Sequence, residues 1–351
     1  MSDDDIVISS LGMVTPVGLS SRETAASVRA GIARFAQTLW TDTRLEPLVL
    51  SEVPAAGLPP LTDSPDELLS LRERRLVQLA RSALAECVAP LTSARIAARV
   101  AVALPEVTLQ FLRGRNAFLA QLIATPDRLP LQPSDPPSQG RAGGLLALGE
   151  AIARLRAGKD RFVVAGGVDS YHDPAVLRQL DQEKRVKSSR NLDGFIPGEG
   201  AAFLLLSKRR TAAEVGLPPI AVLTAVASGV EEGHFYSTAP YRGEGLAATF
   251  RTFFSSNGLR EPVREVYSSM NGERFWAKEW GVAYLRSRSA FSPAHGMHHP
   301  ADSYGDVGAA SGPLMVGLAA LGVQGGYRQS PCLVYCSSDF GPRAVVAASA
   351  A

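Results

Sequence analysis

Cysteine is scarce in this 351-residue chain, and its three copies lie at no spacing that is typical of a metal site. Cys87 falls within a predicted helix, while Cys332 and Cys336 share one apolar run near the end of the sequence. Four residues span about 13 Å along a strand, which is too far for a disulfide between Cys332 and Cys336. We therefore expect free thiols and a reducing, cytoplasmic environment.

Long apolar runs and charge excess are missing too. No run reaches the roughly 18 residues of a membrane-spanning helix. The first ten residues, MSDDDIVISS, are acidic, so we expect no signal peptide. The net charge of +2 argues against an extended nucleic-acid surface. The composition, 46% hydrophobic, predicts a protein with a large core in two domains or one two-part domain.

What the chain does contain is an alternation of apolar runs and helical patterns. Ser20 and Glu23 form a capping box that predicts a helix to about Ala30. Residues 36–66 hold several prolines and no sustained period, so we expect irregular structure there. Residues 65–91 place their apolar side chains on one helical face. Residues 5–18 are predicted to form a short apolar strand followed by a turn. Further strands are predicted over 99–104, 220–228 and 263–270, and a further helix over 245–256.

Two predicted helices, 143–158 and 308–321, are rich in glycine and alanine, which favours close packing against another backbone. Gly158 is a plausible C-terminal stop for the first of them. Each helix is followed by a pair of apolar strands, at 161–164 and 201–206 and at 332–337 and 344–348. The recurring order predicts a duplicated α/β unit with halves 1–210 and 211–351.

The turn before the strand at 201–206 reads GFIPGEG and contains Gly198, Glu199 and Gly200. Glycine-rich turns can cradle ligands, but this one leads directly into a fully apolar strand. We interpret Glu199 as a buried structural carboxylate that accepts backbone N–H groups of the loop.

Four segments of the sequence resemble the β-ketoacyl synthases of the thiolase fold, and the resemblance spans nearly the whole chain. They are DIVISSLGMVTPVG, AGGVDS followed by GFIPGEGAAFLLL, GDVGAASG, and SSDFGPRAVV. The resemblance implies a five-layer αβαβα fold made of two pseudo-repeats. It also implies a homodimer, or a heterodimer with another thiolase-fold protein, and an acyl carrier protein as a partner. The chain is shorter than most members before residue 140, which implies a reduced cap over the acyl pocket.

The catalytic residues of that family are absent from the matching positions. A condensing enzyme uses a cysteine thiolate at a helix N-terminus and two histidines. By the family's spacing, the nucleophile falls on Arg141 and the histidines fall on Asn271 and Asp306. The upstream lysine falls at about Ala301, and Phe340 alone matches, as the phenylalanine of the closing turn.

These substitutions imply a catalytically degenerate member of the family. Arg141 and Asp306 would face each other in the former active site and form a bidentate pair. The alternative is that Arg141 points to solvent. Ser138 could serve as a substitute nucleophile, although no histidine follows it at a plausible position. Gln139 resembles the glutamine of family members that act as decarboxylating loaders or chain-length partners, but loaders need the histidines.

Two further groups of polar residues have open interpretations. His295, His298 and His299 could bind a metal or gate the site, or lie in a solvated loop between Pro293 and Pro300. A basic cluster could dock an acidic carrier or belong to a solvated loop; its members are Lys184, Arg185, Lys187 and Arg190.

Two functions follow from these observations. The first is a non-enzymatic partner, scaffold or accessory and chaperone protein, acting beside an active synthase or a bacterial secretion effector. The alternative is an acyltransferase or condensing enzyme that acts on acyl thioesters with a non-standard site. We expect no cofactor and no metal in either case.

Overall fold

The computed structural model describes residues 2–61, 69–94, 96–106, 115–124, 129–134, 138–257, 259 and 261–351. Within these residues, eleven strands belong to one mixed sheet, and two more form a separate hairpin. The strands before residue 210 are β1 (Ile6–Val14), β2 (Ala36–Thr41), β3 (Pro47–Leu50), β4 (Ala98–Ala103), β5 (Leu131–Pro133), β6 (Phe162–Ser170) and β7 (Glu199–Lys208). Those after it are β8 (Ala221–Leu223), β9 (Ala227–Val230), β10 (Val263–Ser268), β11 (Phe291–His298), β12 (Cys332–Ser337) and β13 (Pro342–Ser349).

The strand pairing repeats along the chain. In the first half, β7 pairs antiparallel with β1 and β6, and β4 pairs parallel with β6 and β5. In the second half, β13 pairs antiparallel with β9 and β12, and β10 pairs parallel with β12 and β11. β8 pairs with both β1 and β13 and so joins the two ladders. The duplicated α/β unit is therefore present, while its boundary near residue 210 stays a prediction.

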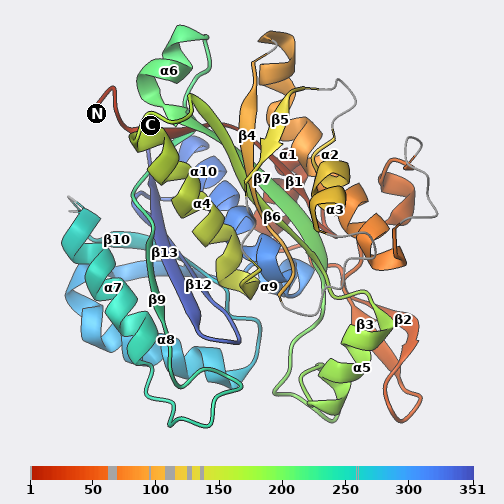
Figure 1. Ribbon diagram of the computed structural model, residues 1–351. Coiled ribbons are helices and arrows are strands. Elements are labelled where there is room, and N and C mark those ends of the chain that lie inside the picture. Colours follow the sequence, from red (N-terminus) through yellow and green to blue (C-terminus); the bar gives the residue numbers. More distant parts are fainter. Residues whose placement is uncertain are drawn as a thin grey trace.

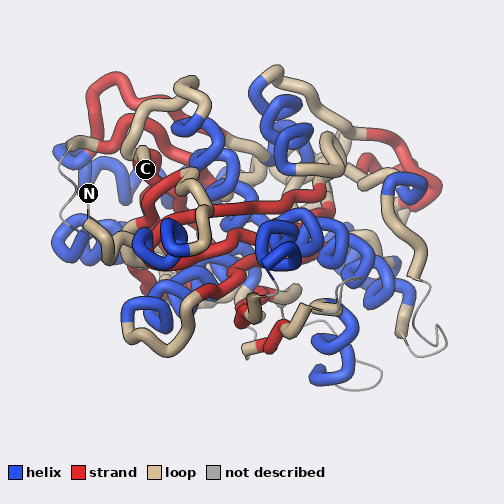
Figure 2. Tube along the Cα trace, turned by 90° about the horizontal axis from the view of Figure 1, so that it is seen from above, coloured by secondary structure: helices blue, strands red, loops and turns tan. Residues whose placement is uncertain are grey.

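Helices separate and cover the two ladders in five layers (Figure 1). The helices are α1 (Ser21–Arg29), α2 (Leu71–Ala94), α3 (Arg115–Leu122), α4 (Gly140–Arg156), α5 (Pro174–Gln182), α6 (Arg209–Glu214), α7 (Glu244–Asn257), α8 (Arg274–Ser287), α9 (Ala301–Tyr304) and α10 (Ser311–Gln324). α4 and α10 form the middle layer, α2 and α3 cover one ladder, and α7 and α8 cover the other. Figure 2 shows the strands from above, with helices on both sides of them.

The alternation of side chains along β7 explains this layering. Leu204 and Leu206 pack into the core around α4 and α10, whereas Phe203 and Leu205 pack into the core around α2. Both faces of the strand are buried, so its sequence is a continuous apolar run.

Small residues let the middle-layer helices approach each other, as the sequence predicts. A Cβ atom on Gly144 would lie 2.2 Å from Pro313 Cδ and 2.6 Å from the Ala309 carbonyl oxygen. α4 ends where expected, because Gly158 follows its last turn with a φ of 67°.

The predicted start of α1 is confirmed in detail. Ser20 Oγ accepts a hydrogen bond from the Glu23 N–H at 3.3 Å. The Glu23 carboxylate accepts from the Leu19 N–H at 2.8 Å, one residue earlier than the usual capping box places it.

Other expectations need correction. Residues 36–50 form the β2–β3 hairpin, and a 3₁₀ turn follows at Ala55–Gly57, so this stretch is not irregular. The strand expected over 220–228 is two strands, β8 and β9. The helix expected over 65–91 is α2, which begins at Leu71; residues 62–68 lie outside the described part. The segments that bear on a reduced cap, 107–114, 125–128 and 135–137, lie outside it too.

The interpretation of the histidine run as a solvated loop is also wrong. His295 and His298 lie in β11 and are partly buried, and His298 Nε2 is 2.7 Å from Glu265 Oε2. β11 ends the strand order of the sheet, and an edge strand tolerates Pro293 because its unpaired side needs no N–H donor. Among the described residues, no group of three or more histidine, cysteine or acidic side chains is arranged to hold a metal ion.

Candidate functional site

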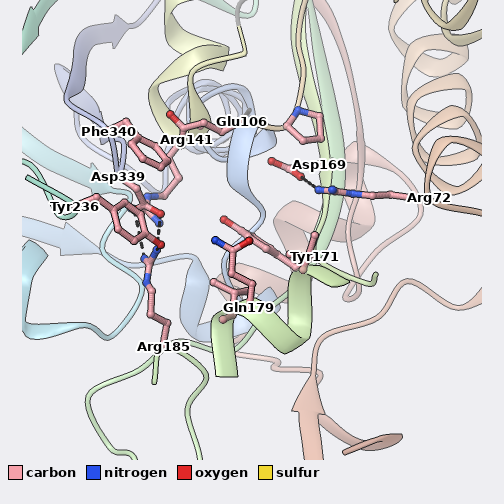
Figure 3. Close-up of a pocket in the computed structure, with 14 residues that line it drawn as sticks. Arg72, Glu106, Arg141, Asp169, Tyr171, Gln179, Arg185, Tyr236, Asp339 and Phe340 are labelled. Atoms are coloured by element: carbon pink, nitrogen blue, oxygen red, sulfur yellow. Dashed lines mark hydrogen bonds and ion pairs between the residues drawn. The ribbon is translucent and has the colours of Figure 1, made fainter. Parts of the chain in front are cut away.

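A small cavity of about 140 Å³ lies at the N-terminus of α4, beside the end of β6 and the turn between β12 and β13. Figure 3 shows side chains converging on it from several elements. Arg141 comes from the first turn of α4, and Asp339 and Phe340 come from the turn between β12 and β13. Arg185 and Tyr236 come from two long loops. Residues distant in sequence thus share one polar centre.

Arg141 is buried, with 2% of its surface exposed, and its guanidinium group is fully engaged. Nε donates to the Ser337 carbonyl oxygen at 2.9 Å, Nη1 donates to Asp306 Oδ2 at 2.7 Å, and Nη2 donates to Asp339 Oδ1. The guanidinium carbon lies 4.3 Å from the centre of the Trp276 ring. The expected contact with Asp306 is present, but it is not bidentate, because the second nitrogen pairs with Asp339. The alternative of a solvent-facing Arg141 is wrong.

Asp306 brings the three predicted positions together. Its Oδ2 accepts from both Arg141 and Asn271 Nδ2, the latter at 2.8 Å. Its Oδ1 accepts from the Gly308 N–H at 2.9 Å, which fixes the carboxylate just before α10. Arg141, Asn271 and Asp306 therefore meet at a single carboxylate group.

Arg185 forms the second half of this network. Its Nε and Nη2 donate to the two carboxylate oxygens of Glu273, both at 2.8 Å, in a bidentate pair. Its Nη1 donates to Asp339 Oδ2 at 2.6 Å and to Tyr236 Oη at 3.0 Å. Asp339 thus accepts from both Arg141 and Arg185. We call these residues and Asp306 the ion-pair network, which comprises Arg141, Arg185, Glu273, Asp306 and Asp339.

The burial of Arg185 corrects the picture of a basic surface cluster. Only 2% of its side chain is exposed, so it is no part of a solvated loop face or a carrier-docking patch. The remaining members are exposed; they are Lys184, Lys187 and Arg190.

Electrostatics in the cavity differ from one carboxyl group to the next. Burial favours the neutral form of Asp339, but Arg141 and Arg185 outweigh it and lower its pKa to about 2. Glu106 lacks such a balance, because burial and the nearby Asp339 charge raise its pKa to about 7 despite Arg141.

The pKa of Asp169, at the end of β6, is raised like that of Glu106. Burial raises the pKa of Asp169 to about 6, although Arg72 and the N–H groups of Ala309 and Ser170 favour its charged form. The pKa values of these carboxyl groups therefore differ according to how directly each one faces a guanidinium group.

The described residues that line the cavity include no cysteine, serine or histidine. Cys87 lies in α2, and Cys332 and Cys336 lie in β12, all three as buried free thiols. Burial raises the pKa of Cys332 to about 12 and that of Cys336 above its usual range, which disfavours a reactive thiolate.

The hydroxyl group nearest the start of α4 has a structural role. Ser338 Oγ accepts from the Ala142 N–H at 2.9 Å and donates to the Gln139 carbonyl oxygen. The β12–β13 turn is thereby tied to the first turn of α4. Gln139 is exposed and Ser138 is partly buried, and neither lines the cavity as far as the structure describes it.

Phe340, the matching residue of the closing turn, lies at the cavity and is 49% exposed. Its ring stacks on Tyr236 with a centroid distance of 4.8 Å. Tyr236 Oη also donates to Glu183 at 2.5 Å, so the stack is anchored on one side only.

Glu199 is fully buried and acts as an internal tie, as the sequence indicates. It accepts from the Val53 N–H at 2.8 Å, from Arg75 Nε at 3.0 Å and from Ser170 Oγ at 2.9 Å. The backbone donor comes from a distant segment rather than from the loop itself, which corrects the expectation. Burial opposes ionisation, but Arg75 and His172 outweigh it and lower the pKa of Glu199.

The glycines on either side of Glu199 are packed against backbone. A Cβ atom on Gly198 would lie 2.3 Å from the Tyr304 carbonyl oxygen, and one on Gly200 would lie 2.9 Å from that of Val14. The turn is thus shaped by close packing.

Sequence reasoning missed Asp339, Arg185, Glu273 and Trp276 as members of the site. Asp339 stands beside Phe340 in SSDFGPR, and Glu273 follows Asn271 by two residues, so both lay within segments already singled out. The charge on Asp339, beside Phe340 in the closing turn, was the available signal.

No helix among the described residues is both long and apolar enough to cross a membrane.

Part of this chain is similar to a known protein family. Residues 140–212, which run from α4 into α6, match the family model described as Beta-ketoacyl synthase, N-terminal domain. Over 91 residues the chain is 34% identical to polyketide synthase PksN of Bacillus subtilis (strain 168), a match that covers 24% of this chain and 2% of that protein. The chain thus corresponds to a small fraction of the length of that curated relative.

Solved structures extend the likeness to the whole chain. The ketosynthase from module 6 of the bacillaene synthase of Bacillus subtilis 168 matches with a TM-score of 0.82 and 16% identity, over 99% of this chain and 72% of that one. A type II PKS acyl-carrier protein in complex with its ketosynthase matches with a TM-score of 0.81 and 16% identity, over 99% of this chain and 100% of that one. The ishigamide ketosynthase/chain length factor matches with a TM-score of 0.79 and 16% identity, over the full length of both chains. The chain therefore has the fold of these ketosynthase structures, and its segment over α4, β6 and β7 is similar to the N-terminal domain of β-ketoacyl synthases.

Proposed function

We propose that this protein is a catalytically degenerate β-ketoacyl synthase-like protein that acts as a non-enzymatic partner of another protein. The observation that carries the proposal is Arg141. It occupies the position that the resemblance gives to the nucleophile, and Asp306 and Asp339 hold it in place while buried.

The chemistry of arginine supports this interpretation. A guanidinium group stays protonated in proteins and offers donors only, so it can act neither as a nucleophile nor as a general base. Its partners Asp306 and Asn271 stand where the family's histidines would be, and both are engaged with each other. An acyl chain that entered here would have to separate buried ion pairs, which costs about 3–5 kcal/mol when one partner is lost.

The partner that best fits is another thiolase-fold protein or an acyl carrier protein. The similar structures are described as a ketosynthase with its acyl-carrier protein and as a ketosynthase/chain length factor. A homodimer and a chaperone role for a secretion effector are the other assemblies that the proposal includes.

The absence of catalysis is tested by incubating the purified chain with acetyl, malonyl and octanoyl thioesters and measuring its intact mass. We expect no mass gain, while an active ketosynthase treated in parallel gains one acyl group. A stoichiometric adduct would contradict the proposal and support the acyltransferase alternative. Loss of that adduct in Ser138→Ala would identify Ser138 as its nucleophile.

The partner is tested by affinity capture of the tagged chain from its native host, followed by mass spectrometry. A synthase or an acyl carrier protein enriched over a tag-only control is the expected result. Enrichment of a secretion effector would favour the chaperone role instead, and recovery of the chain alone would favour the homodimer.

A further inference from the structure

A second, larger pocket lies on the other side of Arg72 from the ion-pair network. It has a volume of about 460 Å³ and lies between the β2–β3 hairpin, the start of α2 and the segment that leads into α5. We call it the arginine pocket, and the lining residues that matter here are Arg34, Trp40, Leu71, Arg72, Arg75 and His172. None of them belongs to the network around Arg141.

Two buried side chains in the wall of this pocket have nitrogen atoms without a partner among the described residues. Arg72 is 8% exposed, its Nε has no hydrogen-bond partner there, and its nearest carboxylate contact in that part of the chain is 3.9 Å long, from Nη2 to Asp169 Oδ1. His172 has a side chain that is 8% exposed, and its Nε2 also has no hydrogen-bond partner among the described residues. Buried polar atoms are nearly always paired, so two such atoms in one wall indicate a missing group.

The nature of the missing group follows from Arg72. Its Nε is a donor, so a group that satisfied it would be an acceptor. His172 Nδ1 lies 3.5 Å from both Glu52 Oε1 and Glu199 Oε2, which leaves Nε2 as the ring nitrogen available to a ligand.

The pocket is lined by three arginines and by two carboxylates, Glu52 and Asp173. Arg75 already donates hydrogen bonds to Glu199 and to the Val53 carbonyl oxygen. Asp173 accepts from two backbone N–H groups at the start of α5 and so serves that helix. Arg34 lies exposed at the rim and makes no side-chain hydrogen bond or ion pair with another described residue.

Apart from Glu52, the rest of the pocket is apolar. Trp40 is 36% exposed and Leu71 is 85% exposed, which is high for such large apolar side chains. Leu50 and Val53 close the wall behind them. A ligand that satisfied this pocket would carry both an anionic group and an apolar body.

We propose that the arginine pocket binds an organic anion, a carboxylate or phosphate monoester on an apolar body. The anionic head pairs with Arg72 and His172, assisted by Arg34, and the body covers Trp40 and Leu71. This site is separate from the position of the nucleophile, so it holds whether or not the chain is catalytic.

Isothermal titration of the full chain with three probes of equal chain length tests the proposal. Octanoate and octyl phosphate carry the two anionic heads, and octanamide carries the same body without charge. We expect saturable binding of at least one anion at one site per chain, about tenfold or more tighter than octanamide, because charge-assisted hydrogen bonds are lost with the amide. The tighter of the two anions identifies the head group. Equal binding of all three probes, or no saturation by either anion, would overturn the proposal.

Variants locate the site. Arg34→Gln and Arg72→Gln should each weaken binding of the tighter anion about tenfold, whereas Arg251→Gln, the same change on an exposed face of α7, should not. Arg34 has no side-chain partner to lose, so its variant tests the site even where Arg72→Gln folds poorly. Trp40→Phe should remove the fluorescence change caused by the anion. Unchanged affinity in Arg34→Gln together with a retained fluorescence change in Trp40→Phe would place the anion elsewhere and refute the proposal.

Discussion

A single carboxylate, Asp339, accepts hydrogen bonds from two arginines, Arg141 and Arg185. Arg141 is 198 residues away in sequence and Arg185 is 154 residues away, and both guanidinium groups are buried. Each arginine has another carboxylate partner, Asp306 or Glu273, so neither depends on Asp339 alone. Without Asp339, however, Nη2 of Arg141 would stay buried without its carboxylate, and Nη1 of Arg185 would keep only the Tyr236 hydroxyl as a partner among the described residues.

Asp339→Ala should therefore destabilise the protein by about 3 kcal/mol, as expected when one member of a buried ion pair is removed. Urea denaturation followed by circular dichroism measures the free energy of unfolding. Asp193→Ala is the matched control, because it removes an ion pair with Arg274 in which the two side chains are 39% and 86% exposed. That control should change the free energy of unfolding by less than about 1 kcal/mol. Equal effects of the two variants would show that burial of the network adds nothing.

Glu106 should make the stability depend on pH near neutrality. Its pKa is 4.5 in the unfolded chain and is raised to about 7 in the fold by burial and by Asp339. Between these values the folded state binds more protons than the unfolded state, so the free energy of unfolding falls as the pH rises from about 4.5 to 7. Above pH 7 this contribution levels off.

Glu106→Gln removes the titrating group. The fall in the free energy of unfolding between pH 5 and 7 should therefore be smaller in the variant by roughly 2 kcal/mol. Urea denaturation across this range, for the variant beside the unaltered chain, gives the difference. A residual slope is expected in the variant from Asp169, whose raised pKa acts in the same direction. Identical slopes in the two proteins would show that Glu106 ionises normally in the fold.

Among the elements, the contact between α4 and the segment that enters α10 depends on a missing side chain. Alanine is about 1 kcal/mol better than glycine in a helix interior, but a Cβ atom on Gly144 would overlap Pro313 and the Ala309 carbonyl. Overpacking of this kind costs about 1–3 kcal/mol. Gly144→Ala should therefore lower the thermal midpoint measured by scanning calorimetry.

Gly281 in α8 supplies the opposite case with the same substitution. A Cβ atom there would meet no atom within 4 Å, so only the helix propensity changes. Gly281→Ala should raise stability by up to about 1 kcal/mol. If both variants shift the midpoint in the same direction, the small residues of α4 do not act through packing.

The same elements show how far sequence patterns reach. The middle-layer helices and the strand pairs were predictable, because glycine-rich helices and continuous apolar runs are local signals of burial. The β2–β3 hairpin was not, because β2 is exposed along most of its length, lacks an alternating pattern and includes Leu39 and Trp40 on the surface. β11 was missed because Pro293 argues against a strand except at an edge, and the edge is a property of the assembled sheet.

The candidate site was predictable in part for a similar reason. Arg141, Asn271 and Asp306 were found by spacing within segments that resemble a family, and the fold brings them to one carboxylate. Arg185 looked like one charge among several in a polar loop. Its burial results from Glu273 and Asp339, which lie 88 and 154 residues further along the chain, and no local pattern encodes such a pairing.

For the whole molecule, the middle layer and the ion-pair network should couple the two halves, 1–210 and 211–351, into one folding unit. Chains of this length often unfold through intermediates, one half at a time. Here α4 and α10 pack against strands of both ladders in one continuous core. Arg141 and Arg185 of the first half also pair with Asp306, Glu273 and Asp339 of the second.

Tryptophan fluorescence can test this coupling, because Trp276 and Trp280 lie in α8 and Trp40 lies in the β2–β3 hairpin. In Trp40→Phe the fluorescence reports only on the second half, whereas far-UV circular dichroism reports on both. We expect the two probes to give coincident urea transitions, as a single cooperative unit requires. A fluorescence midpoint that differs from the dichroism midpoint would mean that the halves unfold separately. The ion-pair network would then be a contact between two independently folded halves. Coincidence would instead make the ion-pair network the place where the two repeats are held together, since its buried charges are paired only when both are folded.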